Sequence, residues 1–287
     1  MLRSCNVQVS PQFVPVIFSL AAVFSWGASD FLGGYEVRRA NAFVFTTVVN
    51  VGGLLLVGMA TAVSRAPFPA AASMEWALAG GVSGGAALGI FYRALSSGRM
   101  GLTAPVAAVL SAAIPALFAV FTQGSPGKIA ISGFALAAAG LWLITRSEDG
   151  ASPQGLGLAV VAGLGFAGFY LCIHQAGEGA AFWVATITRI GGLAITAAIV
   201  IAQKSFRQIT AAGVRWGVLT GGLDSLGTVL FVRASQTGRL DEAVVLSSLY
   251  PAVTVLLARL ILKERFTRWR FVGLMAALAA VPMIAAR

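Results

Sequence analysis

Charged residues inside long apolar segments are the first candidates for chemistry in this sequence. Arg189 and Asp224 each lie near the middle of an apolar segment, and Asp30 lies toward the end of another. An ionised group at the centre of a bilayer costs on the order of 3 kcal/mol or more, so such groups pair or contact polar ligands. We predict that Arg189 and Asp224 pair, either to hold an amino-acid-like or other polar substrate or as a structural ion pair.

Asp224 and Asp30 are also the candidates for proton coupling, because few other acids lie within apolar segments. A carboxylate that binds a proton and a substrate in turn would support an antiport mechanism. Asp224 shares a helix face with Thr220 and Thr228, four residues away on either side, and such a polar face suits a wet cavity. For Asp30, a position at the membrane–water interface is the alternative.

Three aromatic residues within apolar segments are further candidates for a binding cavity. They are Trp26, Tyr170 and Tyr250. Each ring offers an apolar face together with an N–H or O–H group that can contact a polar ligand. Packing between helices or contact with lipid is the alternative for all three.

The elements that must position these residues are membrane-crossing helices. The chain is 58% hydrophobic and 10% charged, its mean hydropathy is +0.86, and a soluble domain would carry about 25% charged residues. Ten apolar segments follow one another, each long enough to cross a hydrocarbon core of about 30 Å. They are residues 12–34, 41–63, 73–97, 100–122, 127–145, 154–175, 180–202, 211–236, 240–262 and 266–286.

The composition argues against several classes of function. The net charge of +10 comes from basic residues scattered over short connections, which argues against a nucleic-acid partner. Two cysteines are too few for a disulfide framework or a metal site. We find no phosphate-binding loop and no nucleotide fingerprint, so we expect no cofactor and no ATP hydrolysis. The expected partners are a small-molecule substrate and the lipid bilayer.

The first half of the chain is repeated in the second half at a shift of about 140 residues, so that Trp76 corresponds to Trp216. The repeats are residues 12–146 and 154–286, with five apolar segments each. An odd number of crossings turns the second repeat upside down, as in many secondary transporters that bind their substrate between the repeats. The predicted fold is an all-α integral membrane protein of ten transmembrane helices in two inverted five-helix repeats.

The repeats differ at the charged positions. The corresponding residues, with the first repeat named first, are Asn50 and Arg189, Gly84 and Asp224, and Asp30 and Tyr170. A substrate is rarely symmetric, so we place its binding site where the symmetry of the repeats is broken. Asn50 thereby joins the candidate site.

Small residues recur at every fourth position in the third and eighth segments, where they share a helix face. Such faces let helix backbones approach closely, and they also suit a seam between moving halves. The residues are Ser73, Ala77, Gly81, Gly85 and Gly89 in the third segment and Gly213, Gly217, Gly221 and Ser225 in the eighth.

Prolines lie in the fourth segment of each repeat, Pro115 in the first and Pro251 in the second. An interior proline removes a helix hydrogen bond and can kink the helix. We predict kinks at both residues, so that the two segments bend around a central cavity. A kink without a role in transport is the alternative.

Short motifs in both halves carry a resemblance to a known family. They are Trp26-Gly27, Tyr92-Arg93-Ala94-Leu95 with Gly98, Leu249-Tyr250-Pro251, and Leu262-Lys263-Glu264-Arg265 before Gly273. With these motifs the chain resembles EamA-type ten-helix transporters of the drug/metabolite transporter superfamily. The resemblance implies movement of small metabolites or drugs, often amino acids outward, across the cytoplasmic membrane. A high ratio of arginine to lysine, 17 to 3, suggests a bacterial source.

The orientation of the chain has two opposing indications. Most basic residues outside the segments lie in the connections after odd-numbered segments, which places both termini outside by the positive-inside rule. The resemblance implies both termini inside.

We expect a multi-pass secondary transporter, a monomer or homodimer, that exports its substrate by alternating access. One alternative is an intramembrane serine protease, because residues 81–84 read Gly-x-Ser-Gly and His174 could act as base for Ser83. That pattern is weak where 34 of 287 residues are glycine, and a protease does not explain ten repeated segments. A membrane sensor or scaffold is the other alternative, and no soluble output domain is expected.

Overall fold

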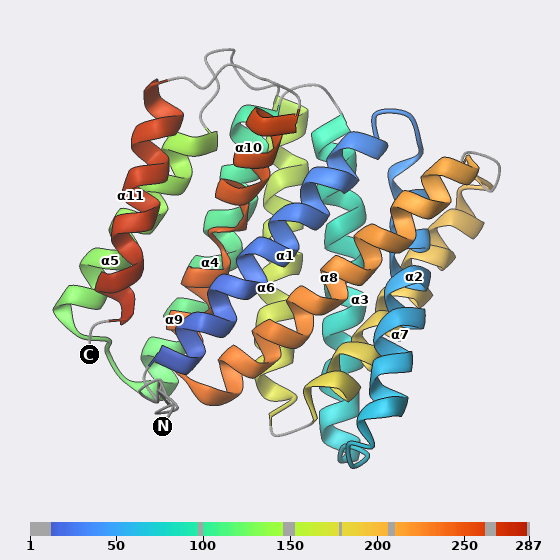
Figure 1. Cartoon of the computed structure of the whole chain (residues 1–287), viewed down its shortest axis with the longest axis horizontal. Coiled ribbons are helices and arrows are strands. Elements are labelled where there is room, and N and C mark those ends of the chain that lie inside the picture. Colours follow the sequence, from blue (N-terminus) through green and yellow to red (C-terminus); the bar gives the residue numbers. More distant parts are fainter. Residues whose placement is uncertain are drawn as a thin grey trace, which may run out of the picture.

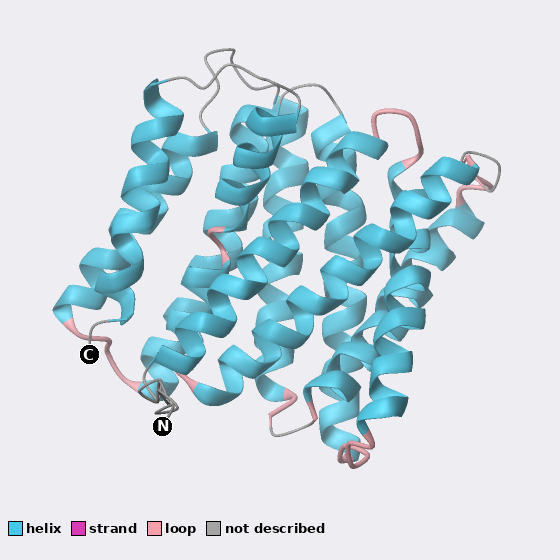
Figure 2. Ribbon diagram, in the orientation of Figure 1, coloured by secondary structure: helices cyan, strands magenta, loops and turns pink. Residues whose placement is uncertain are grey.

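The protein is all α-helical in the part of the chain that the structure describes. This computed structural model describes residues 13–96, 100–145, 153–177, 180–205, 210–261 and 268–285. The helices of these ranges pack side by side as one bundle (Figures 1 and 2). They are α1 (Val14–Glu36), α2 (Ala42–Ser64), α3 (Ala71–Ser96), α4 (Met100–Gln123), α5 (Lys128–Thr145), α6 (Pro153–Gln175), α7 (Ala181–Ala202), α8 (Ala211–Thr237), α9 (Leu240–Ser247), α10 (Tyr250–Ile261) and α11 (Arg268–Ala285).

The helices correspond to the ten predicted segments with one difference. The ninth segment is divided into α9 and α10, and each other segment is one helix. By length and composition alone, four helices in the described ranges could cross a membrane: α1, α2, α7 and the Gly157–Gln175 part of α6.

The two halves run in opposite directions through the bundle. α1 begins at the end of the bundle where α11 ends, whereas α6 begins at the opposite end (Figure 1). Helices of one half pack mainly on helices of the other. In the first half, α1 and α2 both pack on α8. Their counterparts in the second half, α6 and α7, both pack on α3, which is the counterpart of α8. α5 packs on its own counterpart, α11. The predicted inverted arrangement is confirmed, and the two halves interlock.

Small residues bring the halves into backbone contact. Where α2 crosses α8, a Cβ atom added to Gly221 would lie 2.6 Å from the backbone nitrogen of Gly53. Where α3 crosses α7, a Cβ atom added to Gly85 would lie 2.5 Å from Cα of Gly192. Side chains essentially never approach a backbone so closely, so both crossings need glycine. Gly85 and Gly221 of the predicted small-residue faces therefore lie at the interface between the halves.

The fourth helix of the second half is interrupted inside the bundle (Figure 2). α9 ends at Ser247 and α10 begins at Tyr250. In a continuous helix residue 251 would donate its N–H to the carbonyl of Ser247, but Pro251 has no N–H. Pro251 is instead the second residue of α10, where an N–H would have no partner within the helix. α4, by contrast, runs without interruption across Pro115, so the two prolines act differently.

The connection between α8 and α9 is tied to the connection between α4 and α5. Arg239 forms an ion pair with the fully buried side chain of Asp241, with 3.0 Å between Nη2 and Oδ2. The guanidinium also donates to the backbone carbonyls of Gln123 at 3.1 Å and Gly124 at 2.7 Å. The hydrogen bond that Arg239 donates to Asp241 raises the pKa of Arg239 above its ordinary value, so the arginine stays charged. These four residues, the Arg239 cluster, hold the halves together at one end of the bundle.

Candidate functional site

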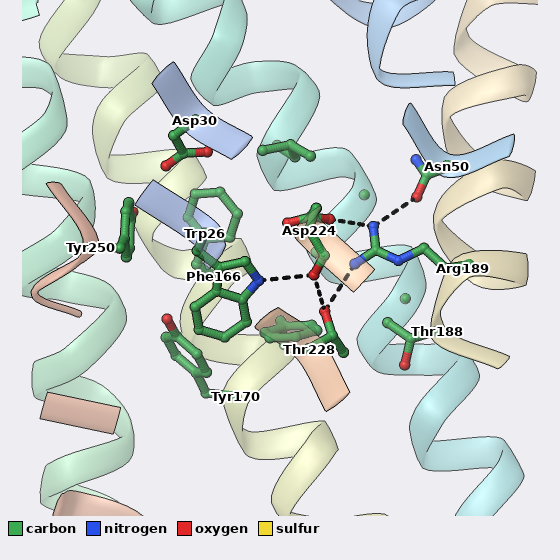
Figure 3. Close-up of a pocket in the computed structure, with 15 residues that line it drawn as sticks. Trp26, Asp30, Asn50, Phe166, Tyr170, Thr188, Arg189, Asp224, Thr228 and Tyr250 are labelled. Carbon is green, nitrogen blue, oxygen red and sulfur yellow. Dashed lines mark hydrogen bonds and ion pairs between the residues drawn. The ribbon is translucent and has the colours of Figure 1, made fainter. Parts of the chain in front are cut away.

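A cavity of about 70 Å³ lies between the two halves (Figure 3). Its lining comes from α1, α2, α3, α6, α7, α8 and α10. It includes all seven residues that the sequence analysis named as candidates for substrate binding. They are Trp26, Asp30, Asn50, Tyr170, Arg189, Asp224 and Tyr250.

Arg189 and Asp224 form an ion pair in the wall of the cavity (Figure 3). Nη1 of Arg189 contacts Oδ2 of Asp224 and donates to Oδ1 of Asn50 at 3.4 Å, while Nη2 donates to Oγ1 of Thr228 at 2.9 Å. The amide nitrogen of Asn50 in turn donates to the carbonyl of Thr46 at 3.0 Å, which orients Oδ1 toward the arginine. The side chains of the pair are only 7% and 13% exposed, so water screens their attraction weakly.

The helix that carries Asp224 is attached to α1 through its backbone. Nε1 of Trp26 donates to the carbonyl of Asp224 at 3.1 Å, and Oγ of Ser25 donates to the preceding carbonyl at 2.7 Å. Oγ1 of Thr228 donates to the Asp224 carbonyl as well, at 3.0 Å. A Cβ atom added to Gly227 would lie 2.7 Å from Nε1 of Trp26, so glycine there leaves room for the indole. The position of the acid therefore depends on a helix of the other half.

Asp30 lines the same cavity without a partner. Within the described residues its carboxylate makes no hydrogen bond and no ion pair, whereas Asp224 is paired with Arg189. When all three groups are ionised, the lining carries two negative charges and one positive charge. The cavity then has a net charge of one negative unit, located at Asp30.

Aromatic rings line the cavity around Asp30. Figure 3 shows Asp30, Trp26, Tyr170 and Tyr250 on one side and Arg189 on the other. The centroid of Trp26 lies 6.0 Å from that of Tyr170 and 6.5 Å from that of Tyr250. The arrangement places an unpaired carboxylate on the same side of the cavity as these aromatic rings, apart from the arginine.

The other residues of the lining were not among the predicted site residues. They are Gly81, Gly84, Gly85, Leu88, Phe166, Phe169, Thr188 and Thr228. Phe169 follows Phe166 by three positions on α6, and both line the cavity, so the helical spacing of the two phenylalanines was the available signal. Thr188 stands next to Arg189 in the chain but had no signal of its own.

The geometry does not support a serine protease. Oγ of Ser83 donates to the carbonyl of Gly165 at 2.7 Å, on the middle of α6. His174 lies nine residues further along α6, which corresponds to about 13 Å along the helix axis. A nucleophile and its base must lie within hydrogen-bond reach.

Within the described ranges, no three His, Cys, Asp or Glu residues are grouped so that they could hold a metal ion.

Comparisons with known proteins agree with this architecture. Residues 153–286 match the EamA-like transporter family. No curated protein matches the chain. Among solved structures 28 chains match. One of them is a crystal structure of a protein that is 14% identical, with 94% of this chain and 95% of that chain covered at a TM-score of 0.75, which establishes a shared fold.

Proposed function

We propose that this chain, whose residues 153–286 match the EamA-like transporter family, is a member of that family within the drug/metabolite transporter superfamily and a secondary carrier for a small polar or amphipathic metabolite. The family consists of multi-pass membrane transporters of small molecules, which are not enzymes. The observation that carries the proposal is the cavity between the halves. It combines a paired arginine and aspartate with a second aspartate that is unpaired.

Alternating access would take place at the interface between the two halves. The glycine contacts of Gly53 with Gly221 and of Gly85 with Gly192 present few side chains that would resist sliding. The Arg239 cluster would separate when its end of the interface opens. The interruption between α9 and α10 would provide a joint beside the cavity, because Tyr250 at the start of α10 belongs to the lining.

Proton coupling is proposed at Asp30 and Asp224, with Asp30 as the first candidate because Arg189 does not neutralise it. The titratable groups that share the cavity with Asp30 are Asp224, Arg189, Tyr170 and Tyr250. Binding of a proton and binding of a substrate at Asp30 would exclude each other. A proton gradient directed into the cell would then drive the substrate outward.

The setting of the carrier is also a proposal. We place it in the cytoplasmic membrane of a bacterium, where it acts as an exporter. We propose that it acts as a monomer or as a homodimer.

Transport by the purified protein in lipid vesicles tests the function. A panel of metabolites is offered with and without an imposed pH gradient, and uptake is measured by mass spectrometry. We expect at least one metabolite to move faster than in protein-free vesicles, with a rate that follows the pH gradient. The Asp30→Asn variant should lose the response to the gradient, while Glu75→Gln, at an exposed acid of α3, should keep it.

Two results would contradict parts of the proposal. If no metabolite of the panel moves, the chain is not a metabolite carrier. If a metabolite moves at a rate that ignores the pH gradient, proton coupling is wrong and exchange or facilitated flux remains.

A further inference from the structure

Arg189 has little capacity left for a substrate carboxylate. Its terminal nitrogens already contact three acceptors, namely Asp224, Asn50 and Thr228. Its Nε atom has no hydrogen-bond partner in the part of the chain that the structure describes, but it is fully buried and is not exposed to a ligand in the cavity. Among the described residues that line the cavity, Arg189 is the single basic residue. A substrate carboxylate that enters the cavity would therefore meet one engaged cation and two carboxylates.

Asp30, in contrast to Arg189, is free to bind a ligand of opposite charge. Its carboxylate has no partner within the described residues, and it is half-buried in a cavity lined by helices. An ionised group that is partly removed from water without a partner is costly, and the cost is removed by a proton or by a cation. A positively charged ligand would satisfy Asp30 and bring the net charge of the cavity to zero.

The aromatic lining around Asp30 favours the same kind of ligand. Trp26, Tyr170 and Tyr250 surround this side of the cavity, and a cation near the face of such a ring is attracted by its quadrupole. Phe169, 6.3 Å from Trp26 between ring centroids, extends the apolar area beside them. An apolar body attached to the cationic group would contact these rings.

We propose that the substrate carries one positive charge, as a protonated amine or a quaternary ammonium group, on a small aromatic or alkyl body, and no carboxylate. Asp30 is its counter-ion, and the ion pair of Arg189 with Asp224 rejects anionic groups because its cation is already engaged. This inference rests on the proposed function, since it takes the cavity to be the transport site.

Three molecules with the same aromatic body test the inference directly. Phenethylamine carries only the ammonium group, phenylalanine carries both charges, and 3-phenylpropionate carries only the carboxylate. Binding to the purified full-length protein is measured by calorimetry, and flux is measured in vesicles. We expect phenethylamine to bind on the order of tenfold to a hundredfold more tightly than the other two, the size of a hydrogen-bonded charge contact.

Variants assign the preference to Asp30. Asp30→Asn should abolish the preference for phenethylamine, Asp30→Glu should restore part of it, and the exposed Glu75→Gln should keep it in full. Size-exclusion profiles check that each variant is folded. Because Asp30 has no partner to lose, its replacement by Asn should not lower the thermal stability.

Equal binding of the three molecules, tighter binding of phenylalanine or 3-phenylpropionate, or binding of none of them would overturn the inference. Phenethylamine binding that survives Asp30→Asn would overturn the role of Asp30. The proposed function can fail independently of this inference. Asp30-dependent binding of phenethylamine without any flux would show that the protein binds amines but is not a carrier. Flux of other metabolites without amine binding would support the carrier function and reject only the cationic substrate.

Discussion

Nε1 of Trp26 donates a hydrogen bond to the backbone carbonyl of Asp224, 3.1 Å away and 198 positions further along the chain. The bond joins the first helix of one half to the helix of the other half that carries the paired acid. The indole also lines the cavity, so one side chain both forms the wall and positions the charge opposite it. A change in how α1 packs on α8 would therefore move Asp224 and alter its ion pair with Arg189.

Removal of the indole N–H should affect transport as well as stability. Trp26→Phe retains an aromatic ring but loses the donor to Asp224, and we expect a loss of about 1 kcal/mol in stability and a KM raised about fivefold. Trp183→Phe is the matched control, because Nε1 of Trp183 donates to the carbonyl of Ala66 at 3.1 Å and the residue does not line the cavity. It should lose similar stability and keep its KM. Equal kinetic effects in both variants would contradict the positioning role of Trp26.

The ion pair of Arg189 and Asp224 should behave as one unit in a double-mutant cycle. Asp224→Asn leaves the buried cation of Arg189 without its counter-ion, and Arg189→Gln leaves the acid unpaired, so each should cost about 3–5 kcal/mol. The double variant, which buries no net charge at this position, should cost clearly less than the sum. Thermal unfolding in detergent measures all three, and additive losses would show that the two side chains do not interact.

The glycine contact between α2 and α8 should not tolerate a methyl group. Gly221→Ala would place Cβ 2.6 Å from the backbone nitrogen of Gly53, and we expect a cost of about 1–3 kcal/mol from the forced separation of the helices. Gly58→Ala in α2 is the control, because a Cβ atom there meets nothing within 4 Å. That variant should gain up to roughly 1 kcal/mol from the higher helix propensity of alanine. Equal stability of the two variants would mean that α2 and α8 are not in close contact.

The Arg239 cluster should stabilise the closed end of the interface. Arg239→Ala removes the donors to Gln123 and Gly124 and leaves Asp241 buried without its cation, so we expect a loss of about 1–3 kcal/mol. Arg239→Lys should recover only part of it, because an ammonium group lacks the planar arrangement of donors that reaches both carbonyls and the acid.

The same variants should differ in access to the cavity. A cysteine introduced at Thr228, within the lining, should react faster with a water-soluble thiol reagent from that end of the bundle when Arg239 is replaced by Ala. Labelling at the same rate with and without Arg239 would show that the cluster stabilises the fold but does not restrict access.

The sequence by itself determined the number and order of the membrane segments, the duplication and its inversion, and the presence of charges inside the segments. These features follow from the length of the apolar segments, from the shift that aligns the repeats and from the odd number of crossings in each repeat. The sequence also sufficed to name Arg189, Asp224, Asp30 and Trp26 as candidates, because charged and aromatic side chains are conspicuous within apolar segments.

The sequence also predicted that Arg189 pairs with Asp224, but only the tertiary structure decided that Asp30 has no partner within the described residues. The pairing of Asp224 with Arg189 and the isolation of Asp30 depend on how α1, α7 and α8 are rotated and spaced, which no periodicity within one helix encodes. It likewise decided that the chain breaks before Pro251 but continues across Pro115. The physical reason is that burial and hydrogen bonding of a group depend on its neighbours on other helices, and those neighbours are set by the packing of the two inverted halves.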